Sequence, residues 1–490
     1  MLFPTTVFAL FFAVVFAAHW SLVRYPLARK VTLLAASLFF YGYWSWKFAL
    51  MLLASAALNH MAAKRIHAAR DPARARRAVA WTVAGNLLIL AVFKYTGFLF
   101  TRALVPLAVP VCGWLGTTEQ LITLQEHVLP FIERIVLPIG ISFYTFQAIS
   151  YVVDVHARKT PPAASLLDFT NYLAFFPQLV AGPIIRAPDL LPQMETFPGW
   201  GARIDTGRAA TLILGGLFKK MVLANWLAEH LADPVFSLPE NYGAWDTLLG
   251  VYAYAIQIYC DFSAYSDIAI GCALLLGFEF PVNFHAPYFA VTLQEFWRRW
   301  HISLSSWLRD YLYIPLGGSR QGVARTRVNL FVTFLLGGLW HGADWTFVLW
   351  GAFHGGYLSL ERFVRRMFGL AEKPSDTPSP AWALAGRVWT FQVVCFAWIL
   401  FRARGLADVG EMLSGLGRWQ MESVLCSGTA LAVLTAGFLM QLLDGTRPRW
   451  VWDTVNRWPA WMQGAAAAAV LTLILGVAPQ GVAPFIYFQF

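Results

Sequence analysis

Long apolar runs separated by short polar or basic segments occupy almost the whole chain. These runs begin near residues 3, 31, 79, 128, 166, 209, 245, 328, 382, 424 and 461. Because a helix needs about 20 apolar residues to cross a bilayer, the pattern predicts roughly ten to twelve membrane-spanning helices. We therefore expect an all-α, polytopic membrane protein that forms a single membrane domain over residues 1–490.

Basic residues flank the 31–60 run on both sides, which a single span does not accommodate. Arg29 and Lys30 precede this run, and the basic cluster 64–77 follows it. Because Lys and Arg favour cytoplasmic connections, one span would place one of the two groups on the wrong side. The charge pattern therefore predicts two short helices that turn near residues 41–44.

Residues 294–312 separate apolar from polar side chains at helical spacing. The apolar positions recur every three or four residues: Phe296, Trp297, Trp300, Leu304, Trp307, Leu308 and Tyr311. Charged and hydroxyl side chains fill much of the rest, so the segment is too polar on one side to cross lipid. It predicts an amphipathic helix that lies at the interface or enters the membrane and returns.

The composition excludes a soluble protein and a nucleic-acid binder. Only 13% of the residues are charged and 58% are hydrophobic, whereas soluble domains carry roughly 25% charge. The net charge of +10 comes from Lys and Arg in the connections, as membrane topology requires. Membrane lipids are therefore the expected surroundings. The five cysteines show no metal-binding spacing, and no metal is expected.

One apolar run, residues 328–360, carries a histidine and an aspartate near its middle. Ionisable groups at that depth are costly and mark a functional site. His341 is the natural proton carrier near neutral pH. On one continuous helix Asp344 lies at i+3, where it orients the ring, and Trp345 at i+4 forms an aromatic wall beside it. The alternative is a histidine that only packs between helices.

Two further histidines need weighing against His341. His301 belongs to the amphipathic segment, and a re-entrant turn would bring it to the same cavity as His341. Alone it would be an ordinary interfacial histidine. His354 follows His341 by 13 positions, about 20 Å along a continuous helix and facing the opposite way. We therefore expect His354 to pack in the core or serve a second site.

Two carboxylates interrupt the apolar run that begins near residue 245. Asp261 and Asp267 are six positions apart, about 120° around a helix, so they do not form an acid–base pair. Buried carboxylates need partners, and a structural polar network is favoured over direct catalysis. The chain also lacks the GxSxG, Walker A and HExxH motifs, so any catalysis depends on the membrane histidines.

Several of these segments together resemble the membrane-bound O-acyltransferase (MBOAT) family. The similarity rests on residues 259–271, 296–304 (Phe-Trp-Arg-Arg-Trp-His-Ile-Ser-Leu), 313–318 (Tyr-Ile-Pro-Leu-Gly-Gly) and 338–346 (Gly-Leu-Trp-His-Gly-Ala-Asp-Trp-Thr). It is most specific across residues 255–356. Within the family the chain is most similar to the bacterial alginate and peptidoglycan O-acetyltransferase membrane subunits. Asp344 departs from that branch, which often has Asn there.

The resemblance implies a helical bundle around a central tunnel, with a catalytic histidine at its constriction. His341, next to Trp340, matches that histidine, and His301 matches a position that is His, Asn or Asp across the family. The last residues, 485–490, resemble a short Phe-x-Tyr-x-x-Phe motif of these export systems. Tyr487 would then carry the acyl group; the alternative is an aromatic anchor at the membrane interface.

The implied activity is transmembrane O-acetylation of an extracytoplasmic polysaccharide, such as alginate or peptidoglycan. Acetyl-CoA would be the cytosolic donor substrate, with no bound cofactor. His341 would act as general base, with His301 orienting or stabilising. Arg298 and Arg299 would pair with donor phosphates, or they merely follow the positive-inside bias. The implied location is the bacterial inner membrane.

The resemblance also implies a partner, because the chain encodes no second catalytic apparatus. We expect a periplasmic hydrolase-like acetyltransferase of the SGNH type to complete the transfer. Two alternatives stay open. One is transfer of D-alanine or another acyl group to a cell-envelope polymer. The other is non-covalent transport of a polysaccharide or lipid, in which His341 would have no chemical role.

Overall fold

The structure is a computed structural model that describes residues 1–180, 182–197, 199, 204–368, 379–419, 422–446, 449–479 and 485–486. Within these ranges the secondary structure consists of helices, without strands. The N-terminal helices are α1 (Thr6–Ser21), α2 (Pro26–Gly42), α3 (Trp46–Ala68), α4 (Pro72–Phe98), η1 (Leu99–Leu104), α5 (Val105–Leu115), α6 (Thr118–Glu133), α7 (Ile141–His156), α8 (Leu166–Ala174), α9 (Phe176–Leu179) and α10 (Ala187–Glu195).

The central helices are α11 (Thr206–Phe218), η3 (Lys219–Ala224), α12 (Asn225–Leu227), η4 (Ala228–Ala232), α13 (Asp233–Ser237), η5 (Pro239–Asn241), α14 (Ala244–Leu275), η6 (Pro287–Phe289), α15 (Leu293–Arg299), α16 (Ile302–Leu308) and η7 (Arg309–Tyr313). The C-terminal helices are α17 (Val323–His341), α18 (Trp345–Met367), α19 (Pro380–Arg402), α20 (Leu406–Gly417), α21 (Gly428–Thr446), α22 (Arg449–Arg457) and α23 (Ala460–Val477).

Five helical segments of the described chain are long and apolar enough to cross a membrane. They are Pro72–Leu115, Thr206–Ser237, Ala244–Leu275, Pro380–Arg402 and Ala460–Val477. This confirms the all-α, polytopic class. Each predicted apolar run does coincide with helix, but the other helices are shorter or more polar than a span. The predicted number of ten to twelve therefore exceeds the helices that meet both conditions.

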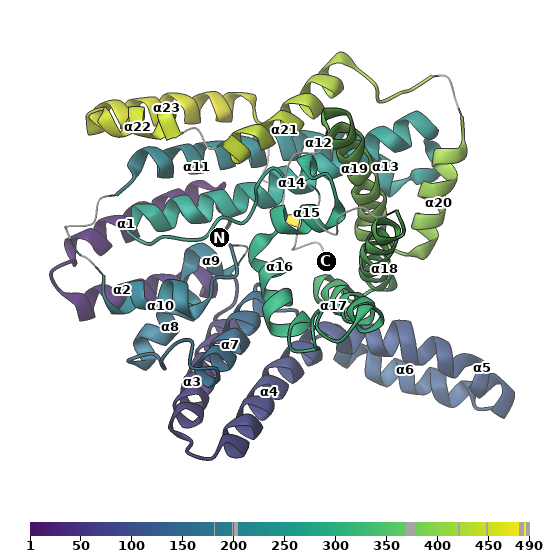
Figure 1. Ribbon diagram of the computed structural model, residues 1–490, viewed down its shortest axis with the longest axis horizontal. Coiled ribbons are helices and arrows are strands. Elements are labelled where there is room, and N and C mark those ends of the chain that lie inside the picture. Colours follow the sequence, from purple (N-terminus) through teal and green to yellow (C-terminus); the bar gives the residue numbers. More distant parts are fainter. Residues whose placement is uncertain are drawn as a thin grey trace.

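Helix α14 crosses the centre of the molecule and organises the packing around it (Figure 1). Helices α11, α22 and α23 lie on one side of it, α3, α4 and α7 on the other, and α17–α19 near one end. The approach of α11 to α14 depends on two glycines. A Cβ at Gly216 would lie 2.9 Å from the Ala264 oxygen, and one at Gly271 would lie 2.9 Å from the Ala209 oxygen.

The 328–360 run is not one continuous helix, contrary to the sequence-based expectation. Helix α17 ends at His341, and Gly342 is extended (φ −156°, ψ 157°). Helix α18 begins at Trp345 and packs back against α17. The physical cause is a set of glycines at the contact, because a Cβ at Gly338 would lie 2.2 Å from the Phe347 oxygen. This break places His341 at the tip of a helix, within reach of ligands.

The amphipathic segment is also divided. Its predicted apolar residues are buried except for Tyr311, which is half-buried. They are spread over three short helices, α15, α16 and η7, with Trp300 in the break after α15. The break between α15 and α16 falls at His301, whose backbone is left-handed with φ 42°. In contrast, the predicted division of 31–60 is confirmed, since α2 ends at Gly42 and α3 begins at Trp46.

Candidate functional site

Aromatic side chains from three helices surround His341 at the tip of α17. Its ring lies 5.0 Å from that of Trp340, 5.0 Å from that of Trp350 in α18, and 5.1 Å from that of Phe401 in α19. The side chain is buried, with 6% of its surface exposed. The predicted aromatic wall beside this histidine is therefore present, but Trp345, the residue predicted to form it, is not among these neighbours.

The sequence analysis placed Trp345 and Asp344 on one continuous helix with His341. Because the helix breaks after His341, both residues lie in other positions. Trp345 is exposed, stacks edge-on against Phe98, and donates its indole N–H to the Arg102 oxygen at 3.1 Å. Asp344 is the N-cap of α18, where its Oδ1 accepts from the Thr346 amide at 3.0 Å. An N-cap satisfies an otherwise unpaired helix amide, so Asp344 supports the hairpin and does not orient the imidazole.

Two neighbouring side chains of α4 hold the end of α17 in place. The Lys94 ammonium donates to the carbonyl oxygens of Trp340 and His341, the latter at 3.1 Å. The Tyr95 hydroxyl donates to the Leu339 oxygen at 2.7 Å. The last carbonyl oxygens of a helix have no hydrogen-bond donor within that helix. Lys94 and Tyr95 supply these donors. The sequence analysis missed both, although a lysine inside an apolar run is a signal of this kind.

His301 lies in the turn between α15 and α16 and is fully buried. Its Nδ1 lies 3.3 Å from the Asn283 Oδ1, which also accepts from the Ser303 hydroxyl at 2.8 Å and from the Ser303 amide at 3.1 Å. The edge of the Phe262 ring, 4.6 Å away, closes one side of the imidazole. Asn283 and Ser303 therefore fix the orientation of the His301 ring.

Trp340 lies between the two histidines that the sequence predicted to share a site. Its ring is 6.3 Å from that of His301 and 5.0 Å from that of His341. The His301 Nε2, the Trp340 indole N–H and the Trp350 indole N–H are buried without a hydrogen-bond partner among the described residues. Buried polar groups of this kind are rare and need an explanation. Here they cluster around His341, where they are available to a polar substrate.

His354 lies much closer to His341 than a continuous helix would allow. Because α18 packs back against α17, the Trp350 ring contacts both imidazoles, at 5.0 Å from His341 and 4.6 Å from His354. The Trp297 indole N–H points to the His354 Nδ1 at 3.4 Å. The opposite-facing geometry that we predicted is therefore wrong, while the core-packing position of His354 is as expected.

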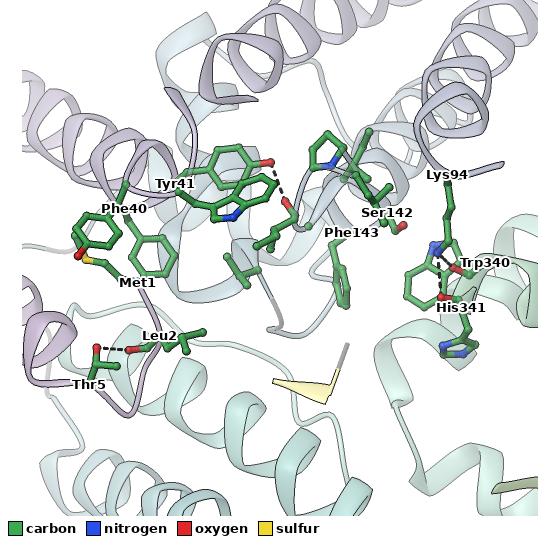
Figure 2. Close-up of a pocket in the computed structure, with 18 of the residues that line it drawn as sticks. Met1, Leu2, Thr5, Phe40, Tyr41, Lys94, Ser142, Phe143, Trp340 and His341 are labelled. Carbon is green, nitrogen blue, oxygen red and sulfur yellow. Dashed lines mark hydrogen bonds between the residues drawn. The ribbon is translucent and has the colours of Figure 1, made fainter. Parts of the chain in front are cut away.

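An apolar cavity of about 740 Å³ is lined on one side by His341. Figure 2 shows Met1, Leu2, Phe40 and Tyr41 on one side of it and Lys94, Trp340 and His341 on the other. Its walls come from the residues at and before the start of α1, the end of α2 and residues 137–143, which lead into the first turn of α7. We call this space the apolar cavity.

A second cavity of about 330 Å³ lies at the other end of α7. Its lining includes three basic side chains, Lys159, Arg186 and Arg309, and it reaches Ile302 and Ser303 beside His301. Arg186 and Arg309 bind the same carboxylate, that of Asp310, at 2.7 Å and 2.6 Å. The hydrogen bond to Asp310 raises the pKa of Arg309. We call this space the polar cavity.

The two cavities approach the histidine pair from the two ends of α7. The apolar cavity is lined by Phe143 near the start of α7, and the polar cavity by Asp154 near its end. Eleven helical residues separate these positions by roughly 16 Å. His341 lines the first cavity, and Ser303, whose hydroxyl is 3.4 Å from the His301 Nδ1, lines the second. The pair of imidazoles therefore stands between them.

Arg298 and Arg299 do not line either cavity. Arg298 is exposed, and Arg299 forms an ion pair with Glu295 at 2.5 Å one helical turn earlier. The basic side chains at the polar cavity, which the sequence analysis did not single out, come from the ends of α7, α10 and η7. No local motif joins them, because the fold collects them from three separate segments.

Asp261 is part of a polar network, as the sequence favoured. One carboxylate oxygen pairs with Lys220 at 2.8 Å, and the other accepts from the Ile486 amide at 2.9 Å. Asp267 pairs separately with Lys219 at 2.5 Å. The candidate acyl carrier, Tyr487, lies outside the described residues.

Comparison with known proteins gives the class of this chain. The profile of the membrane-bound O-acyltransferase family matches residues 78–401, about two thirds of the sequence and both histidines of the site. The chain belongs to this family of membrane-embedded acyltransferases, and the sequence-based resemblance is confirmed.

Individual relatives cover most or all of the chain. A probable alginate O-acetylase, AlgI, of Pseudomonas putida is 37% identical over 100% of both chains. The corresponding protein of Pseudomonas aeruginosa is 38% identical over 91% of this chain and 82% of its own. A peptidoglycan O-acetyltransferase of Helicobacter pylori is 34% identical over 84% of this chain and 79% of its own.

Proposed function

We propose that this acyltransferase passes acetyl groups across the bacterial inner membrane for O-acetylation of an extracytoplasmic polysaccharide. One observation carries the proposal: His301 and His341 flank Trp340 between two cavities that lie at the two ends of α7. A transferase that takes its donor from one compartment and delivers to the other needs this arrangement. The names of the relatives, which refer to alginate and peptidoglycan O-acetylation, support the same chemistry.

The charges of the connections assign the two ends. Arg158, just after α7, donates to the His67 carbonyl oxygen at the end of α3, so the basic 64–77 segment and the end of α7 lie together. The polar cavity is at this end. Since Lys and Arg accumulate in cytoplasmic connections, the polar cavity faces the cytosol and the apolar cavity faces outward.

The polar cavity suits the anionic donor that we propose, acetyl-CoA. Lys159, Arg186 and Arg309 line it together with Asp154 and Asp189. Each basic group already pairs with a carboxylate, Lys159 with Asp154 and the two arginines with Asp310, and donor phosphates would add charge-assisted contacts, which are among the strongest polar interactions in proteins. These three residues are better placed than Arg298 and Arg299 for the donor phosphates, because they share a cavity that reaches the histidines. A cavity of about 330 Å³ is also within the range of small-molecule sites.

The chemistry is two successive acyl transfers. In the first, His341 takes the proton of an attacking hydroxyl, proposed to be that of Tyr487, as its oxygen bonds to the acetyl carbonyl carbon. The carbon–sulfur bond of the thioester breaks, and the thiolate leaves with the proton from the imidazolium. In the second transfer an acceptor hydroxyl attacks the tyrosyl ester, which regenerates the phenol. His301 and the indole N–H groups stabilise the developing oxyanion.

The outward-facing acceptor is proposed to reach the acetyl group through a second protein. The apolar cavity is lined mainly by hydrophobic side chains, which suits an acyl group in transit better than a carbohydrate chain. A periplasmic SGNH-type hydrolase-like partner would then complete the transfer to the polymer. Transfer of D-alanine or another acyl group by the same residues is the nearest alternative.

The test is intact mass of the purified protein after incubation with isotope-labelled acetyl-CoA. Wild type is expected to gain one acetyl group, while Tyr487→Phe and His341→Ala gain none. His127→Ala, which changes an exposed histidine of α6, is the matched control and should label like wild type. If wild type stays unlabelled during turnover, Tyr487 is not the carrier.

The same variants distinguish a transferase from a transporter. In cells, His341→Ala is expected to abolish O-acetylation of the polymer at unchanged protein level, with at least about a hundredfold loss. A transporter without a covalent step would keep delivering its substrate in this variant, and that outcome would overturn the proposal.

A further inference from the structure

Lys220 and Asp261 form a buried ion pair, and Asp261 directly precedes Phe262, whose ring contacts that of His301. The Lys220 ammonium is 2.8 Å from the Asp261 Oδ1, and both side chains are at most 3% exposed. Removing two charges from solvent is costly, so such a pair is weak evidence for stability by itself. The question is therefore what else this pair does.

The second oxygen of Asp261 holds the C-terminal end of the chain. Asp261 Oδ2 accepts from the Ile486 amide at 2.9 Å, across 225 positions of sequence. Phe485 is buried against the Tyr265 ring at 4.2 Å and the Phe262 ring at 5.7 Å. Chain termini usually fray unless something ties them down, and here the tie is a charge-assisted hydrogen bond inside the bundle.

The same aromatic cluster connects the tail to the candidate site. Phe262, whose ring contacts that of Phe485, also contacts the His301 imidazole, with ring centroids 4.6 Å apart. In Figure 2 the yellow C-terminal ribbon lies between the Met1–Tyr41 side of the apolar cavity and His341. The described part of the tail is therefore packed into the wall of the catalytic centre.

We propose that Asp261 and Lys220 are positioning residues, a clamp that seats the C-terminal segment against the catalytic histidines. Lys220 fixes one carboxylate oxygen and thereby turns the other toward the tail amide. Neither side chain takes part in the chemistry. The inference rests on the proposed function, because Tyr487, the proposed carrier, follows Ile486 directly in the sequence.

The test measures the accessibility of a cysteine placed at position 486. Ile486→Cys keeps the backbone N–H that Asp261 binds, and Ile486 is 1% exposed, so the introduced thiol should label slowly with N-ethylmaleimide. Cys112, Cys260 and Cys426 are replaced by Ser or Ala. The buried Cys272 and Cys395 remain and report whether the core stays intact.

The decisive variant adds Asp261→Leu and Lys220→Met, which remove both charges of the pair together. In it, labelling of the introduced thiol is expected to rise about tenfold or more, as for a locally opened segment, while Cys272 and Cys395 stay protected. Unchanged protection of the introduced thiol in this variant would overturn the proposal. So would rapid labelling at position 486 with the clamp intact.

Asp246 provides the matched control. It is a second buried carboxylate of α14, and it holds a different segment by accepting from the Val424 and Leu425 amides, each at 3.1 Å. Asp246→Asn is expected to leave labelling at position 486 unchanged. An equal rise in Asp246→Asn would show general loosening of α14 and would count against a specific clamp.

Activity separates the clamp from the carrier. The Asp261→Leu, Lys220→Met variant should lose at least about tenfold in acetyl transfer, and the same substitutions should cause no further loss in a chain truncated after residue 484. An additional loss in the truncated chain would overturn the positioning role. If the truncated chain transfers acetyl normally, the carrier proposal fails, while the labelling result on tail seating still stands.

Discussion

At the residue scale, the site consists of histidines whose surroundings come from different parts of the sequence. His341 was predictable, because an imidazole deep in an apolar run has few reasons to be there. The residues that hold the two histidines in place were not predictable from the sequence. Lys94 lies 247 positions away from His341, and the Asn283 contact to His301 spans 18. Such contacts leave no periodic signal, so only the folded chain reveals them.

His301 allows a test that separates backbone geometry from chemistry. Its φ of 42° is left-handed, a region that Asn tolerates and β-branched residues do not. His301→Asn should keep the thermal stability of wild type in detergent and lose about a hundredfold in acetyl transfer, because the shorter Asn amide does not place its donor N–H where the imidazole Nε2 lies. His301→Val should in addition lower the free energy of unfolding by about 1–3 kcal/mol.

Melting temperature and acetyl transfer are measured on both variants. Full activity of His301→Asn would remove His301 from the proposed chemistry and leave it a role in shaping the turn. Equal stability of the Val and Asn variants would contradict the left-handed backbone at this position.

At the element scale, the α17–α18 hairpin decides where His341 ends up. The sequence indicated apolar helix over 328–360, and that part is confirmed. It did not indicate the break at Gly342, since the same glycines also fit a continuous helix in close contact with a neighbour. In the folded chain Gly338 of α17 faces Gly351 of α18, and a Cβ at Gly338 would lie 3.0 Å from the Gly351 Cα. These two residues can meet only if the helix breaks between them.

Gly351→Ala should therefore force the two helices apart. Its Cβ would lie 2.4 Å from the Phe334 oxygen and 2.9 Å from the Leu335 Cα, both backbone atoms that cannot rotate away. We expect a destabilisation of about 1–3 kcal/mol and loss of acetyl transfer, because His341 moves with the end of α17. Thermal unfolding in detergent and the transfer assay measure the two effects.

Gly356→Ala is the control on the same helix, since its Cβ meets nothing within 4 Å. Alanine is the better helix former by about 1 kcal/mol, so this variant should be as stable as wild type or more so. If both variants behave alike, close packing at Gly351 is not what holds the hairpin.

At the scale of the whole molecule, two cavities approach one histidine pair from the two ends of α7. Tyr43 lines the apolar cavity and Pro188 the polar one. If the polar cavity faces the cytosol, a membrane-impermeant maleimide added to intact spheroplasts should label Tyr43→Cys and not Pro188→Cys. Inverted vesicles should give the opposite result. The background lacks Cys426, which is exposed.

The expected difference between the two preparations is about tenfold or more, because the bilayer excludes a charged reagent. Labelling of both positions from the same side would contradict the assignment of the polar cavity to the donor. It would leave the identity of the catalytic histidine untouched.

Apolar runs of about 20 residues can satisfy their backbone in lipid only as helices, so the sequence alone determined the all-α membrane class. It also determined His341 as the residue to examine, because a buried titratable group is costly wherever it lies. The tertiary structure decided the rest: the break that frees His341, the Lys94 support, the basic lining of the polar cavity, and the attachment of the tail to Asp261. Each depends on contacts between residues far apart in the chain, which close packing sets and hydropathy does not encode.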